Sequence, residues 1–83
     1  MTYGYEKIDM KATGENIKTL MENKSISIQE MSQELGISFQ AVWRYVKGKT
    51  LPTVPHLFVM AQILDSSVED LVVIKRSANT RKY

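Results

Sequence analysis

The sequence predicts an all-α protein, a compact bundle of about five short helices. Apolar residues recur three and four positions apart along most of the chain, which is the spacing of one buried helix face. Side chains that cap helix starts precede these segments, and Gly36 and Gly48 follow two of them. The length of 83 residues provides room for one small domain.

The first helix is expected over residues 10–22. Asp9 is a suitable N-cap, because its carboxylate can accept hydrogen bonds from the backbone amides of the first turn. Gly14 falls within the first turns, where the absence of a side chain permits close packing. The buried stripe has i, i+3, i+4 spacing and consists of Ile17, Leu20 and Met21.

A second helix is expected after Ser27, which forms a capping box with Glu30 three residues later. Gly36 ends this helix, because glycine adopts the left-handed conformation at little cost. The apolar face of this helix consists of Ile28, Met31 and Leu35.

The third helix is expected to start after the capping residue Ser38 and to run to about Lys47, before Gly48. Thr53 caps a fourth helix, in which Pro55 is tolerated because it lies in the first turn. The core stripe of the fourth helix consists of Leu57, Met60, Ala61 and Leu64.

A short fifth helix is expected after Ser67, which forms a second capping box with Asp70. Its apolar residues are Val68 and Leu71. Residues 72–74 fit either a short strand or the end of this helix. The final residues are polar and basic, and two roles are open for them: a basic arm that attracts polyanions, or an end without a role.

The composition argues against several classes of protein. Without cysteine there can be no disulfide and no thiolate metal site, and one histidine, His56, cannot build a metal site by itself. The acids are spread over helix surfaces and there is no glycine-rich phosphate loop, so we expect neither catalysis nor a cofactor. No apolar run is long enough for a bilayer, and a cytoplasmic location is expected.

Charge is distributed unevenly along the chain. Residues 1–71 hold seven Lys/Arg and nine Asp/Glu, whereas the remaining residues hold four basic residues and no acid. No carboxylate occurs in residues 35–64, a range that contains Arg44, Lys47 and Lys49. This asymmetry favours a surface that faces a polyanion, and a chance gap in the acids is the alternative.

The third helix separates into two faces when its residues are placed at 100° steps. The inward arc consists of Val42, Tyr45, Val46 and, half-buried at its edge, Phe39. The opposite stripe consists of Gln40, Arg44 and Lys47, and Trp43 flanks this stripe.

The side chains of this stripe suit the DNA major groove. Gln40 can pair with the adenine edge and Arg44 with the guanine edge, whereas Lys47 suits a phosphate. An ordinary solvated helix face is the alternative. Trp43 could contact a thymine methyl group or a deoxyribose, or could fold down onto the domain.

The stretch "SIQEMSQELGISFQAVWRYVKGKTLPTVPHL", residues 27–57, resembles the core pattern of the lambda-repressor/Cro helix-turn-helix family, or XRE family. Residues 35–38 match the turn between the paired helices of this family, and Val42 and Tyr45 match its inward-facing positions. The similarity covers about residues 10–71. Ile28 stands where the family often has glutamine, and Asp65 stands where it usually has glycine.

The resemblance implies a DNA-binding domain over residues 10–71, between an N-terminal arm of residues 1–9 and a basic tail of residues 72–83. The third helix would enter the major groove. Five residues would face base edges or nearby backbone: Ser38, Phe39, Gln40, Trp43 and Arg44. Four others would hold phosphates: Gln29, Lys47, Lys49 and Thr50.

Together these features predict a cytoplasmic, sequence-specific regulator of transcription that binds double-stranded DNA. A repressor acting as a homodimer is the expected form, without a cofactor and without a membrane partner. The alternative is a protein-interaction module or antitoxin on the same fold, in which a protein partner covers Trp43 and DNA binding is secondary.

Overall fold

The computed structural model describes residues 7–75, and these residues fold into five helices. The expected roles of the basic end concern mainly residues 76–83, which lie outside the described residues. Within residues 7–75 the only extended pairing is a single antiparallel bridge, so the all-α fold class is confirmed. The helices are α1 (Met10–Asn23), α2 (Ile28–Leu35), α3 (Phe39–Val46), α4 (Val54–Ile63) and α5 (Val68–Leu71).

Each helix begins at the capping residue that the sequence predicts. Every one of these side chains accepts a hydrogen bond from the backbone amide three residues later, which satisfies an amide that has no partner within the helix. Both predicted capping boxes are present, at the starts of α2 and α5. The five capping residues are Asp9, Ser27, Ser38, Thr53 and Ser67.

The first four helices end in one motif, in which a left-handed residue closes the last turn and two backbone amides fold back onto it. At the end of α3, for example, the Lys49 amide donates to the Arg44 carbonyl at 2.9 Å. The left-handed residues are Ser25, Gly36, Gly48 and Asp65, with φ of 58°, 69°, 72° and 53°.

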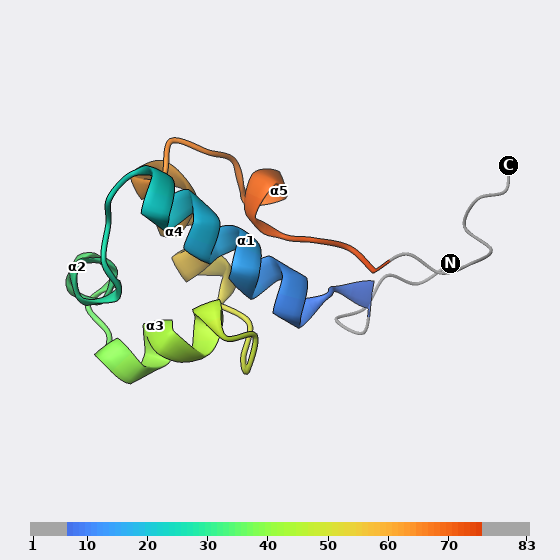
Figure 1. Ribbon diagram of the computed structural model, residues 1–83, viewed down its shortest axis with the longest axis horizontal. Coiled ribbons are helices and arrows are strands. Elements are labelled where there is room, and N and C mark those ends of the chain that lie inside the picture. Colours follow the sequence, from blue (N-terminus) through green and yellow to red (C-terminus); the bar gives the residue numbers. More distant parts are fainter. Residues whose placement is uncertain (1–6, 76–83) are drawn as a thin grey trace, which may run out of the picture.

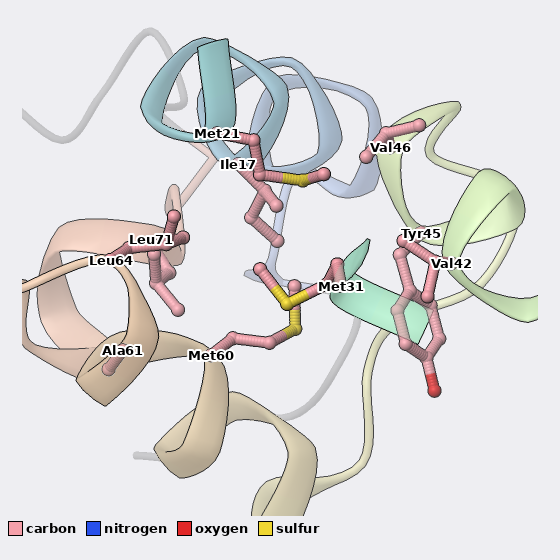
Figure 2. Close-up of a cluster of buried hydrophobic side chains, with 10 residues drawn as sticks. All are labelled: Ile17, Met21, Met31, Val42, Tyr45, Val46, Met60, Ala61, Leu64 and Leu71. Atoms are coloured by element: carbon pink, nitrogen blue, oxygen red, sulfur yellow. The ribbon is translucent and has the colours of Figure 1, made fainter. Parts of the chain in front are cut away.

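The core lies where the inner faces of all five helices meet (Figure 2). Three methionine side chains fill its centre, and unbranched thioethers adapt well to the irregular space between short helices. The core residues are Ile17, Met21, Met31, Val42, Tyr45, Val46, Met60, Ala61, Leu64 and Leu71.

Helix α1 lies across the C-terminal end of α3 at very short range. A Cβ atom on Gly14 would stand 2.5 Å from the Tyr45 carbonyl oxygen and 2.7 Å from that of Val46. On the other side, a Cβ atom on Gly48 would stand 2.6 Å from the Lys11 Cα atom. The two backbones therefore touch directly, as the sequence suggested for Gly14, and this contact fixes the direction of α3 (Figure 1).

The chain after α5 returns to the start of α1. Val72 is extended and ends α5, and Ile74 forms the antiparallel bridge with Ile8. The Val73 amide donates to the buried Thr13 hydroxyl at 2.9 Å, and the Val73 carbonyl accepts from the Asp9 amide at 2.8 Å. Residues 72–74 thus form one bridge, neither a full strand nor a continuation of the helix.

Candidate nucleic-acid interface

The inner face of α3 is anchored as the helical spacing predicts. Val42, Tyr45 and Val46 are all at most 7% exposed. The Tyr45 hydroxyl is hydrogen-bonded to His56 Nδ1 of α4 at 3.0 Å, and burial raises the pKa of this tyrosine above its ordinary value. These contacts prevent α3 from rotating about its axis, so its opposite side must face away from the core.

The outward face of α3 carries the predicted polar stripe. Gln40, Arg44 and Lys47 are all exposed, and the rim residue Trp43 is 38% exposed. The Lys47 Nζ atom lies over the Trp43 ring, 5.9 Å from its centroid, which is cation–π range. The placement of these side chains follows the prediction, whereas their contacts with DNA stay a prediction.

Phe39 corrects the helical-wheel expectation, which placed it on the inward arc, because it is 46% exposed and belongs neither to the core nor to the residues packed against it. Phe39 is the first residue of α3. A helical side chain leans toward the turn that precedes it, and before Phe39 there is no helical turn to pack on. A wheel assumes a continuous helix and therefore fails at a helix end.

Four of the predicted site residues surround one shallow hollow on α3. Its volume is about 270 Å³, and two pairs of side chains line it. The two members of each pair stand one helical turn apart. Aromatic side chains form one pair, and polar side chains form the other. The lining residues are Phe39, Gln40, Trp43 and Arg44.

The other predicted site residues flank this surface. Ser38 caps α3 through its Oγ atom, which accepts from the Ala41 amide at 3.1 Å, and its hydroxyl proton can still be donated. Lys49 and Thr50 are exposed directly after α3, and Gln29 is exposed in the first turn of α2. Gln29 is thus contributed by a different helix from the residues at the hollow.

Among residues 7–75, no carboxylate forms an ion pair with the cations of this region. Within residues 7–75 the one ion pair joins Lys24 and Asp65, which lie in the turns after α1 and α4. The hydrogen bond and the charge of Lys24 lower the pKa of Asp65. Arg44, Lys47 and Lys49 are therefore available to a polyanion.

Among the described residues, no three His, Cys, Asp or Glu side chains lie close enough together to hold a metal ion. None of the helices in residues 7–75 combines the length and the apolar character that crossing a bilayer requires.

For α4, the helical spacing predicted the core stripe but gave no indication of an apolar outer face. Val54, Phe58 and Val59 are 54%, 59% and 38% exposed. Beside Phe58, a hollow of about 410 Å³ opens between α4 and α5. A signal was present in the sequence, because residues 50–64 contain no charged residue although 24% of the chain is charged.

The pair α2 and α3, joined by a left-handed glycine turn and covered by α1 and α4, defines a helix-turn-helix domain. The chain belongs to the HTH_3 helix-turn-helix family, whose model matches residues 17–71. This membership confirms the predicted resemblance and supports DNA binding and transcription regulation as the class of function. No curated protein matches the sequence.

Solved structures share the fold at low sequence identity. The restriction-modification controller protein C.AhdI from Aeromonas hydrophila has a TM-score of 0.70 at 19% identity, covering 76% of this chain and 96% of that one. The clp gene regulator ClgR from Corynebacterium glutamicum has 0.70 at 18%, covering 75% and 66%. The hypothetical transcription factor NHTF from Neisseria has 0.71 at 16%, covering 89% and 85%.

Proposed function

We propose that this protein is a sequence-specific transcriptional repressor that binds double-stranded DNA as a homodimer and inserts α3 into the major groove. The observation that carries this proposal is the outward face of α3, where Gln40 and Arg44 are exposed one turn apart and no carboxylate neutralises the arginine. Both side chains can pair bidentately with purine edges in the major groove.

Cations and small polar groups around α3 would hold the DNA backbone. Lys47 and Lys49 follow the base-reading residues toward and beyond the end of α3, and Thr50 comes next. Gln29 and the Ser38 hydroxyl lie near the starts of α2 and α3, where unpaired amides also favour phosphate. Repression is the simplest output, since a protein that occupies a promoter excludes polymerase by its volume alone.

The outer face of α4 supports the homodimer. Phe58 projects from this face, and the adjoining hollow is lined by Phe58 itself, Ala61 and Val68 together with polar residues. A projection and a hollow on one face are self-complementary, because a twofold axis places each Phe58 over the hollow of the other copy. A contact centred on so few side chains belongs at the small end of specific interfaces, roughly 1,000 Å².

Selection of bound sites from a random duplex library tests the proposal. We expect a palindrome whose half-sites lie about one helical turn apart, because each copy presents one α3. The logarithm of affinity should fall with the logarithm of salt concentration with a slope of about −3 to −5 per subunit, since Arg44, Lys47, Lys49 and cations of the basic end would each contribute about 0.9. Failure to bind any duplex at low ionic strength would overturn the proposal.

The apolar face of α4 also favours a second candidate, a protein-interaction module or antitoxin whose partner binds through apolar contacts. Salt separates the two functions. An apolar protein interface loses little affinity as salt rises, whereas contacts to phosphates weaken steeply.

A further inference from the structure

The two aromatic side chains on the outward face of α3 have no role in the fold. Phe39 and Trp43 are 46% and 38% exposed, and neither belongs to the core or to the half-buried residues packed against it. They stand one helical turn apart and form the apolar wall of the 270 Å³ hollow. Gln40 and Arg44 form the polar wall.

The chemistry of the major groove offers one apolar group that fits such a wall. Phosphates and base edges there are polar, and the exception is the methyl group on C5 of a pyrimidine. A methyl group between Phe39 and Trp43 would lie beside the base edges within reach of Gln40 and Arg44. Residues in the first turns of a recognition helix point most directly at base edges, and Phe39 is the first residue of α3.

We propose that Phe39 and Trp43 form a slot for the C5 methyl group of a pyrimidine, next to the base pair that Gln40 or Arg44 contacts. The proposal rests on the proposed function, because the slot meets a base only if α3 enters the major groove. The Nζ atom of Lys47 lies over the Trp43 ring, so the slot would adjoin the phosphate contact that we propose for Lys47.

Replacing each thymine of a selected duplex with uracil tests the slot, since uracil pairs identically and lacks only the methyl group. At one position per half-site we expect a loss of about fourfold in affinity, which corresponds to the roughly 0.8 kcal/mol of one buried methyl or methylene group. Unchanged affinity at every position, with specific duplex binding intact, would overturn the slot and leave the proposed function standing. Absence of any duplex binding would overturn both.

Variants of the protein tie the effect to the slot. Phe39→Ala should bind the thymine and uracil duplexes equally, whereas the matched control Lys49→Ala should weaken both and keep the fourfold difference. Phe39 is exposed, so the variant should fold, which circular dichroism checks. A fourfold difference that persists in both Phe39→Ala and Trp43→Ala would contradict the assignment.

Methylated cytosine identifies the source of the methyl group. A second duplex carries a C·G pair at the sensitive position. If methylation of this cytosine at C5 raises affinity about fourfold, the slot recognises the methyl group itself. A gain with thymine alone assigns the slot to thymine. Tighter binding to the single strand than to the duplex would mean that the aromatics stack on unpaired bases, which overturns the slot.

Discussion

At the residue scale, buried side chains of α3 hold the helix against the core, and its exposed side chains are the ones that we propose contact DNA. Val42 is fully buried, whereas Arg44, two positions later, is exposed and has no carboxylate partner in the described part of the chain. Because the buried neighbours fix the rotation of α3, the face from which Arg44 projects is set without DNA. Preorganisation of this kind lowers the cost of ordering a side chain on binding.

Arg44→Ala should lower the affinity for the selected site by about 1 to 3 kcal/mol and relax the preference at one base pair, because one bidentate contact is lost. Lys49→Ala should weaken all sequences alike and make the salt slope shallower by about one. Competition binding against single-base variants of the site measures both effects. If Arg44→Ala weakened every sequence equally, the assignment of Arg44 to a base would be wrong.

Ser25→Gly should raise the free energy of unfolding by about 0.5 to 1 kcal/mol, because Ser25 is left-handed at φ 58° and glycine adopts this conformation without strain. Thermal unfolding would show this as a rise of several degrees in Tm. The matched control is Gly36→Ala, where φ is 69° and an added Cβ atom meets nothing within 4 Å. That change should destabilise through backbone strain alone. A lower Tm for Ser25→Gly would contradict this account.

At the scale of elements, the direction of α3 depends on two contacts with its neighbours. The backbone of α1 at Gly14 touches the last turn of α3, and His56 of α4 is hydrogen-bonded to Tyr45. Both contacts act at the C-terminal end of α3, whereas the base contacts that we propose lie in its first turns.

Gly14→Ala should destabilise the fold by about 1 to 3 kcal/mol, because the new methyl group meets backbone oxygens that cannot move without shifting α3. Urea unfolding gives the magnitude. Thr19→Ala, at an exposed position of the same helix, is the control and should change stability by less than about 0.5 kcal/mol. An unchanged urea midpoint for Gly14→Ala would show that α1 and α3 can separate freely.

The burial of the Tyr45 hydroxyl should make stability fall at high pH. Burial raises the pKa of Tyr45 in the folded state, so the folded protein retains the phenolic proton more strongly than the unfolded chain. This contribution is complete below the unfolded pKa of about 10 and is lost as pH rises through the folded pKa.

Unfolding free energies of the wild type and Tyr45→Phe between pH 8 and 11 measure this effect. Near pH 8 the variant should be less stable by about 0.5 to 1.5 kcal/mol, because the hydrogen bond is lost. Above pH 10 the difference should narrow, since phenylalanine does not titrate. A difference independent of pH would contradict the role of burial.

At the scale of the whole molecule, features that depend on residues close in the sequence were predicted better than contacts between distant segments. All five capping residues and the turn at Gly36 were predictable, because each depends on residues within a few positions of it. The partner of His56 was not, because it depends on which segments meet in space, and helical spacing alone cannot specify this. Helical spacing also missed two features that have local causes. The exposure of Phe39 follows from its place at the start of α3, and the absence of charge in residues 50–64 was the signal for the outer face of α4.

The uncharged outer face of α4 is the surface through which, in our proposal, two copies would assemble on a palindromic site. Phe58→Glu should fold, because Phe58 is 59% exposed, and should prevent dimers by placing two carboxylates in an apolar contact. Sedimentation velocity should show a dimer for the wild type that dissociates at micromolar concentrations, as expected for a small interface, and a monomer for the variant.

Thr19→Glu is the matched control, since it adds the same charge at an exposed position of α1 and should leave the dimer intact. On DNA, Phe58→Glu should still bind a half-site but should lose the cooperative gain from a second half-site, because joining two binding modules raises affinity without any new base contact. Equal dimerisation of Phe58→Glu and the wild type would place the twofold contact on another face. The palindrome would then have to arise from contacts outside α4.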